Sequence, residues 1–419
     1  MAPGRAPRMI NSSTLIVLVT VVINMTGVGL FWPILPSLVA ELGGGDVSHT
    51  AVLYGAISVV FALMQFLFAP VMGALSDRHG RRPVLLVALT GMGFDSLLLA
   101  FAPNIWWIFA GRALGGIFGA TFSVANAYMA DVSRGEDRAA AFGLVGAAFG
   151  LGFIIGPLMG GVLGEIDIRL PIYTAAGLSF VNVLFGYLFL KESLTPENRQ
   201  RSSDAKFGFV SALSWLASRR LTLLLAISLL IANTMQRGLE SIWVLFTGFQ
   251  YDWGSREAGV SLAVVGVSFV IVQGVLVRRI VPLIGEVKAI AFGFSLSAAM
   301  YLVLAFNETS WIGFAGIVPH VLGWGIAGPS LQALASRQVG PAQQGYLQGA
   351  FTSIAGLAAI MGPAVATGIF GFFTAAGAPF HFPGAFFLLG GLLLFLAAGI
   401  GALAGREVGR ESGPGSVNS

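Results

Sequence analysis

Four charged side chains lie well inside long apolar stretches of the sequence, away from the ends of those stretches, and they are the strongest candidates for chemistry. They are Asp95, Arg112, Arg237 and Glu240. A charge at the centre of a bilayer costs at least ~2.5 kcal/mol on insertion scales, so such a group usually faces water or a partner of opposite charge. Desolvation favours a protonated carboxyl, whereas a nearby cation favours the carboxylate. Asp95 and Glu240 are therefore candidates for carrying a proton, and the two arginines are candidates for tuning them.

Each of these charges also has a purely structural interpretation. Arg237 precedes Glu240 by three residues, so the two side chains lie on one helix face and can simply pair. Arg112 keeps its proton under all physiological conditions. It can hold an anionic group or bias a carboxylate, but it can also serve as a hydrogen-bonding hub between helices. Both interpretations stay open from the residue types alone.

The stretches that contain these charges define the fold class. The chain is 56% hydrophobic and 10% charged, with a mean hydropathy of +0.84, whereas soluble chains carry about 25% charged residues. A membrane-spanning helix needs about 20 mostly apolar residues. Twelve such runs occur, approximately at 14–36, 51–72, 83–102, 105–128, 139–163, 171–190, 221–247, 258–280, 287–306, 310–333, 345–373 and 383–404. We therefore expect an all-α integral membrane protein with twelve transmembrane helices.

The longest polar stretch, residues 191–220, separates the first six runs from the last six. We interpret it as a cytoplasmic linker between an N-terminal half (1–190) and a C-terminal half (221–404), with a short cytoplasmic tail at 405–419. Two six-helix halves predict pseudo-symmetric repeats around a central cavity. The repeat is degenerate, although Gly156-Pro157 has an echo in Gly362-Pro363.

Lysine and arginine set the expected orientation. Only Arg169 and Arg256 fall in loops that follow odd-numbered runs, and the other basic residues outside the runs lie in the termini and the even-numbered loops. Because cytoplasmic loops carry the excess of Lys and Arg, we expect both termini to be cytoplasmic and the protein to reside in the cytoplasmic (inner) membrane.

Uncharged amides within the runs are candidates for binding a substrate. Buried amides need partners or water, and a water-filled cavity supplies both; hydrogen bonds between helices are the alternative for some of them. The candidates are Asn24, Gln65, Asn126, Asn182, Asn233, Gln236 and Gln273.

A polar segment, Gly73–Pro83, separates the second run from the third, and we expect it to form a tight cytoplasmic turn. Asp131 and Arg138 bound the next loop on the same side. We expect Asp77, Arg81, Asp131 and Arg138 to form a charge cluster that latches one conformation, with Ser76 and Arg78 as further gating residues. Exposed ion pairs contribute only ~0–1 kcal/mol each, so a latch requires partial burial and a network.

The fifth run contains a small-residue pattern. Gly152, Gly156 and Gly160 recur at four-residue spacing, with Gly161 next to the last of them. Such a stripe lets a neighbouring helix approach closely. Pro157 removes one helix hydrogen bond and is expected to bend the helix.

Several of these segments resemble a known family. Gly73-Ala-Leu-Ser-Asp-Arg-His-Gly-Arg-Arg-Pro83 resembles the signature loop of the major facilitator superfamily, G-x-L-[SA]-D-R-x-G-R-R-P. The fifth run resembles the superfamily's antiporter motif, G-x-x-x-G-P-x-x-G-G, and Arg112 with its flanking glycines resembles the pattern R-x-x-x-G. Short strings along residues 11–403, such as Trp243-Val-Leu-Phe-Thr247 and Gln344-Gly-x-Leu-Gln-Gly349, resemble the tetracycline–proton antiporters of the drug-export branch.

This resemblance implies roles for individual residues. Asp95 would serve the substrate and proton path with support from Arg112, Gln65 would lie near the drug, and Ser76, Asp77 and Arg81 would gate. It implies no cofactor beyond the proton gradient, and it allows a chelate of drug and divalent cation as the substrate.

Two departures from the family pattern concern proton coupling. Asn24 and Ser297 stand where the family usually has acids, and neither can carry a proton at physiological pH. Arg237 and Glu240 occupy a region where the family is typically uncharged. Coupling is then relocated to Glu240, or the substrate differs, or coupling is lost; we favour relocation.

We therefore expect a secondary exporter of tetracycline-like or related amphiphilic drugs, coupled to proton influx by alternating access. The alternatives are a metabolite exporter, a facilitator with altered coupling, or a non-transporting membrane receptor or scaffold, which we would expect to carry a large soluble module. Cysteine is absent and no phosphate-binding loop or triad spacing occurs, so we expect neither an enzyme nor a metal or nucleic-acid site, and no oligomer is required. The histidines are scattered and are interpreted as loop or interface residues: His49, His79, His320 and His381.

Overall fold

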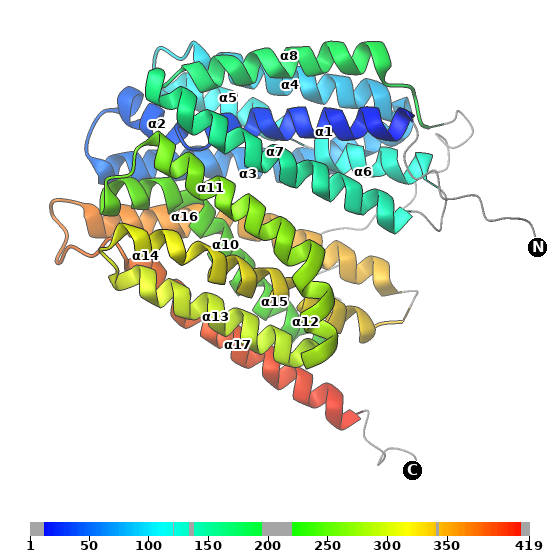
Figure 1. The fold of residues 1–419 in the computed structure, drawn as a ribbon, viewed down its shortest axis with the longest axis vertical. Coiled ribbons are helices and arrows are strands. Elements are labelled where there is room, and N and C mark those ends of the chain that lie inside the picture. Colours follow the sequence, from blue (N-terminus) through cyan, green and yellow to red (C-terminus); the bar gives the residue numbers. More distant parts are fainter. Residues whose placement is uncertain (1–11, 120, 134–137, 195–219, 341–342, 412–419) are drawn as a thin grey trace, which may run out of the picture. The chain divides into compact units, whose positions relative to one another are not determined.

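The computed structural model describes residues 12–119, 121–133, 138–194, 220–340 and 343–411, which are largely helical (Figure 1). The helices of the first half are α1 (Ser12–Phe31), α2 (Leu35–Gly43), α3 (Val47–His79), α4 (Arg81–Ala100), α5 (Ile105–Phe118), α6 (Thr121–Val132), α7 (Arg138–Ile166) and α8 (Leu170–Phe189). Those of the second half are α10 (Arg220–Tyr251), α11 (Ser255–Ile271), η2 (Val272–Leu276), α12 (Val277–Ile284), α13 (Glu286–Phe306), α14 (Ser310–Ala315), α15 (Ile317–Arg337), α16 (Gln344–Thr374) and α17 (Ala385–Glu411).

Within these described ranges, 12 helical segments are long and apolar enough to cross a membrane. The prediction of an all-α membrane protein with twelve spans is confirmed. Several spans consist of more than one helix: α5 and α6 form the fourth, α14 and α15 the tenth, and α11, η2 and α12 together form the eighth. The π-helical turn at Val272–Leu276 inside the eighth span had no signal in the sequence.

The polar turn expected over Gly73–Pro83 is much shorter in the structure. Helix α3 continues through His79, and α4 begins at Arg81, so Gly80 alone separates them. Gly80 has a φ of 105°, which lies in a region of backbone conformation that residues with a Cβ rarely adopt. The predicted extent of the turn was wrong because Gly73 through His79 extend the preceding helix, although the position of the reversal was correct.

The described helices form two compact units. The first draws on Met1–Gly44, Val60–Ala205 and Gly254–Gly266, and the second on Gly45–Val59, Lys206–Trp253 and Val267–Ser419. Helices α3 and α11 therefore each contribute to both units, which differs from a simple division of the chain at the linker. Residues 195–219 of that linker and residues 412–419 of the predicted tail lie outside the described residues.

The same helix pairings occur within each of the two units. In the first unit, α1 packs on α7 and α8, and α4 packs on α8 and α5. In the second, α10 packs on α16 and α17, and α13 packs on α17 and α15. Each pair has its counterpart six spans later, as expected for two repeats of one six-helix arrangement. Figure 1 shows α1 running beside α7 in the first unit.

Glycines make the closest of these contacts possible. A Cβ on Gly156 would lie 2.6 Å from the carbonyl oxygen of Thr26 and 2.8 Å from the Cα of Gly29, so α7 meets α1 backbone to backbone. In the second unit, a Cβ on Gly362 would lie 2.8 Å from the Thr234 carbonyl oxygen, which gives α16 the same approach to α10. Gly152 and Gly160 also face α1, near Val22 and Leu30 respectively.

Two further glycine contacts involve the helices that contribute to both units. Gly161 on α7 lies against α11, where its Cβ would be 3.1 Å from the Cα of Gly259. In the second unit, Gly55 near the start of α3 lies directly against the side chain of Thr367 on α16. The start of α3 is therefore packed within the second unit, and the start of α11 is packed within the first unit.

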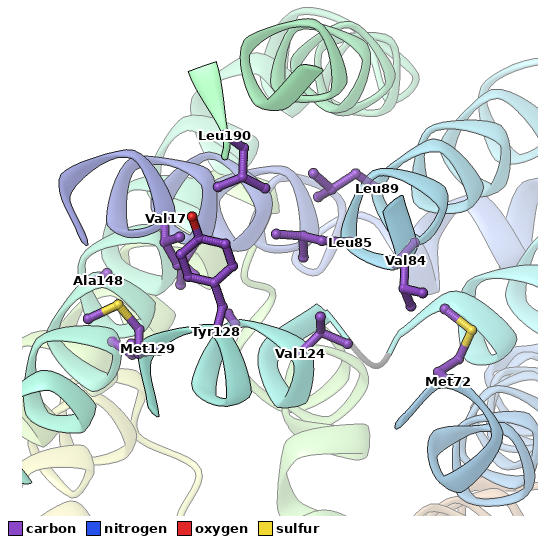
Figure 2. Close-up of a cluster of buried hydrophobic side chains, with 14 of the residues drawn as sticks. Val17, Met72, Val84, Leu85, Leu89, Val124, Tyr128, Met129, Ala148 and Leu190 are labelled. Carbon is purple, nitrogen blue, oxygen red and sulfur yellow. The ribbon is translucent and has the colours of Figure 1, made fainter. Parts of the chain in front are cut away.

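A cluster of buried apolar side chains joins α1, α4, α6 and α7 in the first unit (Figure 2). Tyr128 on α6 stands within it, surrounded by Val17, Leu85 and Met129. The Tyr128 hydroxyl donates a hydrogen bond of 2.7 Å to the carbonyl oxygen of Lys191, just beyond α8. This bond fastens the end of α8 to the core beside the α3–α4 reversal.

Candidate functional site

Asp95 and Arg112 form a buried ion pair between α4 and α5. The Asp95 side chain is 0% exposed and that of Arg112 is 7% exposed. Arg112 Nε donates to Asp95 Oδ1 at 3.2 Å, and Nη2 donates to Oδ2. Both carboxylate oxygens are therefore held by one planar guanidinium, the geometry that makes Arg–carboxylate pairs strong.

The surroundings of this pair are shaped to exclude other groups. The guanidinium carbon lies 4.6 Å from the ring centroid of Phe31 and 5.2 Å from that of Phe61. A Cβ on Gly115 would lie only 2.8 Å from the Asp95 Cγ, so this glycine leaves the room that the carboxylate fills. The pair is locally neutral and enclosed by aromatic rings and backbone, an arrangement that holds helices together and admits a proton only if the pair opens.

Glu240 lies in a different kind of site in the second unit. Its Oε2 accepts a hydrogen bond of 2.8 Å from Arg237 Nη1, and its Oε1 accepts one of 3.3 Å from Gln236 Nε2. The Arg237 and Glu240 side chains are 51% and 31% exposed. Gln236 in turn contacts His320 on α15, with 3.1 Å between Gln236 Oε1 and His320 Nε2. The predicted Arg237–Glu240 pair is thus one part of a longer polar chain.

The remaining amide candidates are distributed over both units. Asn24 is buried on α1, Asn126 is partly buried on α6, and Asn233 is partly buried on α10. Gln65 Nε2 donates to the Gly119 carbonyl at 3.2 Å. Gln273 Nε2 donates to the Gly325 carbonyl at 3.3 Å from within the π-helical turn.

Asn182, by contrast, ties two helices together. It is 0% exposed, and its Nδ2 donates a hydrogen bond of 2.9 Å to the carbonyl oxygen of Thr20 on α1. The helix-bridging alternative therefore describes Asn182 well.

The structure brings most of the predicted gating residues together around Arg81. Its Nη1 lies 2.5 Å from Asp77 Oδ1 and 3.0 Å from Ser76 Oγ, and its Nε lies 3.0 Å from Asp131 Oδ2. The Arg81 side chain is 11% exposed, compared with 35% for Asp77 and 21% for Asp131. Partial burial and a network, the two requirements for a latch, are both present.

Two other predicted gating residues contribute less to this picture. Arg78 is exposed on the last turn of α3. Arg138 begins α7, and its side chain lies outside the described residues.

Glu192 is a member of this cluster that sequence reasoning missed. Its carboxylate accepts from the backbone N–H of Arg81 at 2.8 Å and of Arg82 at 3.3 Å, so it caps the N-terminus of α4. Arg82 Nη2 donates to the Tyr187 carbonyl at 2.7 Å, and Ser193 Oγ donates to Asp131 at 3.0 Å. The chain just after α8 is therefore fastened to the α3–α4 reversal. No local pattern predicts this contact, because Glu192 lies 111 residues from Arg81 along the chain.

His320 is the second residue that was missed. The interpretation of the histidines as loop or interface residues does not describe it, since it is only 8% exposed inside a membrane-spanning segment. A sequence signal did exist: His320 is a titratable group within an apolar run, the same criterion that singled out Asp95.

Comparisons with known proteins agree with this architecture. Residues 17–363 match the family model of the Major Facilitator Superfamily. Tetracycline resistance protein, class C, of Escherichia coli is 39% identical over 362 residues, which cover 86% of this chain and 90% of that protein. The class B protein of Escherichia coli is 36% identical over 356 residues, covering 84% of this chain and 87% of that protein.

Solved structures share the fold. The human organic anion transporter MFSD10 (TETRAN) has a TM-score of 0.70 at 24% identity, covering 94% of this chain and 100% of that chain. The nucleoside transporter NupG has a TM-score of 0.77 at 15% identity, covering 95% of this chain and 100% of that chain. At these identities the likeness concerns the fold alone, whereas the match to the family model extends over most of the sequence. The chain therefore belongs to the Major Facilitator Superfamily and is an integral membrane transporter of a small molecule, not an enzyme.

Proposed function

We propose that this transporter exports tetracycline-like or related amphiphilic drugs in exchange for protons. The observation that carries the proposal is the 39% identity to a tetracycline resistance protein over 86% of this chain. The membrane-buried Asp95–Arg112 pair and the polar chain at Glu240 add titratable groups that a proton-coupled mechanism needs.

In this proposal the protein lies in the cytoplasmic membrane with both termini on the cytoplasmic side. The amides of Asn24, Gln65, Asn126, Asn233, Gln236 and Gln273 contribute to drug binding. The Arg81 cluster then lies at the cytoplasmic face, where it stabilises one state of the alternating-access cycle.

Drug uptake into inside-out vesicles with an acidic lumen tests this function. We expect tetracycline to accumulate and an uncoupler to abolish the accumulation. Vesicles that contain correctly inserted protein but move no drug under the gradient would overturn the proposal. Asp95→Asn keeps the shape of the side chain and removes its charge; at equal amounts of inserted protein it should lose the gradient-driven accumulation.

A second candidate is a facilitator or metabolite exporter with altered coupling. Asn24 and Ser297 favour it, since uncharged residues stand where the resembling antiporters usually carry acids. Drug movement that is equally fast with and without the gradient would select this alternative, and a panel of metabolites in the same vesicles would then identify the substrate.

The latch has its own test, Asp77→Asn at matched expression. We expect altered transport because Asp77 and Asp131 share Arg81. Unchanged transport would remove the latch from the mechanism.

A further inference from the structure

His320 lies where three helices of the second unit meet. It is on α15, its ring centroid is 5.5 Å from that of Tyr301 on α13, and its Nε2 contacts Gln236 on α10. The Ser297 hydroxyl donates to the backbone carbonyl oxygen of His320 at 3.3 Å. The imidazole is therefore fixed by packing and by backbone contacts as well as by its own hydrogen bond.

The hydrogen bonds of the neighbouring polar chain determine which nitrogen of His320 carries the proton. The Glu240 carboxylate can only accept, so Gln236 must present its amide N–H groups to Glu240 and its Oε1 to His320. His320 must then donate from Nε2. In the neutral ring this leaves Nδ1 with a lone pair.

That lone pair has no partner among the residues that the structure describes. His320 Nδ1 is a buried side-chain nitrogen without a hydrogen bond. Because buried polar atoms are nearly always paired, each exception needs a physical explanation. An imidazole nitrogen with a free lone pair is a base, and protonation at Nδ1 leaves the Nε2 bond to Gln236 undisturbed.

Burial alone disfavours a charged imidazole, so a proton-binding role requires a neighbouring anion. The titratable and charged groups facing it are Glu240 and Arg237 through Gln236 on α10, and Tyr301 on α13. The Tyr301 hydroxyl donates to the Met235 carbonyl at 2.8 Å, so it is engaged elsewhere. Glu240 is the anion that would stabilise an imidazolium, because the chain of hydrogen bonds from Nε2 through Gln236 ends on its carboxylate.

We propose that His320 is a proton-binding residue of this transporter, coupled to Glu240 through Gln236. A proton from water adds to the Nδ1 lone pair and converts the imidazole into an imidazolium; on release it returns to water and restores the lone pair. Nε2 keeps its hydrogen throughout. A cationic substrate at Glu240 opposes the imidazolium by like-charge repulsion, so substrate and proton exclude each other.

This inference rests on the proposed drug–proton exchange, and His320→Gln tests it. Glutamine retains an amide that can bond to Gln236 but cannot bind a proton. In proteoliposomes we expect His320→Gln to lose gradient-driven tetracycline accumulation while retaining tetracycline exchange without a gradient. In detergent, the proton release that tetracycline binding causes should be lost as well. His381→Gln, at an exposed loop position, is the matched control and should behave as the wild type.

The outcomes separate the two proposals. A wild-type protein without proton-linked drug movement overturns the proposed function. A coupled wild-type protein whose His320→Gln variant accumulates tetracycline and releases protons normally overturns the role of His320.

A second measurement does not depend on the folding of that variant. With 4 histidines in the chain, ¹⁵N-histidine NMR of the wild-type protein resolves each ring. We expect a His320 Nδ1 signal that titrates over the pH range of transport and is displaced by Glu240→Gln. A signal that stays constant over this range contradicts the proposal.

Discussion

The two acids inside membrane-spanning segments are held in opposite ways. In the first unit, Asp95 is enclosed and both of its oxygens are bound by Arg112. In the second, Glu240 is 31% exposed and shares its oxygens between Arg237 and Gln236, which leads on to His320. The first arrangement is satisfied by a single partner, whereas the second connects a carboxylate to a buried base. The difference indicates that an ion pair inside a transporter can serve mainly stability or mainly chemistry, according to what else its members touch.

The largest expected effect comes from breaking the enclosed pair. Arg112→Gln leaves the Asp95 carboxylate buried without its cation, and removing one partner of a buried pair costs about 3–5 kcal/mol of unfolding free energy. Denaturant unfolding in detergent measures this loss. The double variant Asp95→Asn, Arg112→Gln removes both charges and should recover most of it. A single variant as stable as the wild type would show that this pair does not stabilise the first unit.

The next largest effect should come from disrupting the close helix packing that occurs within each unit. Gly156→Ala places a methyl group 2.6 Å from the Thr26 carbonyl oxygen, and such overpacking costs about 1–3 kcal/mol. Gly362→Ala should cost a similar amount and also displace Arg237, whose Cβ would be 2.6 Å away. Thermal unfolding and transport assays check both.

Gly146→Ala on α7 is the control for these substitutions, because open space surrounds its Cβ position. We expect it to be neutral or slightly stabilising. Equal losses at Gly146 and Gly156 would mean that helix approach is not the cause.

A smaller effect is expected at the helix cap in the first unit. Glu192→Ala removes the acceptor for two backbone N–H groups of α4, and loss of a helix cap costs about 0.5–2 kcal/mol. Glu41→Ala, which removes a surface pair with Arg169, should cost no more than about 1 kcal/mol. If both variants lose the same amount of unfolding free energy, the Glu192 contact contributes no more than an exposed ion pair.

The smallest effect on stability should come from disrupting the Arg237–Glu240 pair. The Arg237 side chain leaves 51% of its surface uncovered by other residues, so Arg237→Gln should reduce the unfolding free energy by less than Arg112→Gln does. The same variant should change the pH dependence of transport, because it removes the cation that balances Glu240. A stability loss as large as that of Arg112→Gln would erase the contrast between the two pairs.

The sequence predicted those parts of the site that depend on local spacing. Arg237 and Glu240 are three residues apart on one helix, so their pairing follows from helix geometry. Asp77 and Arg81 are four residues apart on either side of Gly80, so their pairing follows from the short reversal between α3 and α4. The twelve spans follow from length and apolarity. The assignment of Asp95 and Arg112 to membrane-buried positions was likewise accessible from the sequence.

Other contacts depend on packing between distant segments. Glu192 reaches Arg81 only because the end of α8 packs beside α4, and no pattern within either segment encodes that meeting. The extent of α3 was mispredicted because polar residues such as Asp77 and Arg78 continue a helix beyond its apolar part. His320 was missed for a different reason: the criterion of a titratable group in an apolar run was applied to acids and arginines and not to histidine.

The contribution of α3 and α11 to both compact units has a consequence for protein engineering. A gene divided within the segment that encodes residues 195–219 would yield two fragments, each carrying a stretch that completes the other's unit: Gly45–Val59 in one and Gly254–Gly266 in the other. Produced alone, the C-terminal fragment would lack the Gly55 surface that Thr367 packs against, and the N-terminal fragment would lack Gly259 beside Gly161. Each fragment therefore supplies a stretch that the other fragment lacks. Split reporters built on this transporter should assemble only when both fragments are produced in the same cell.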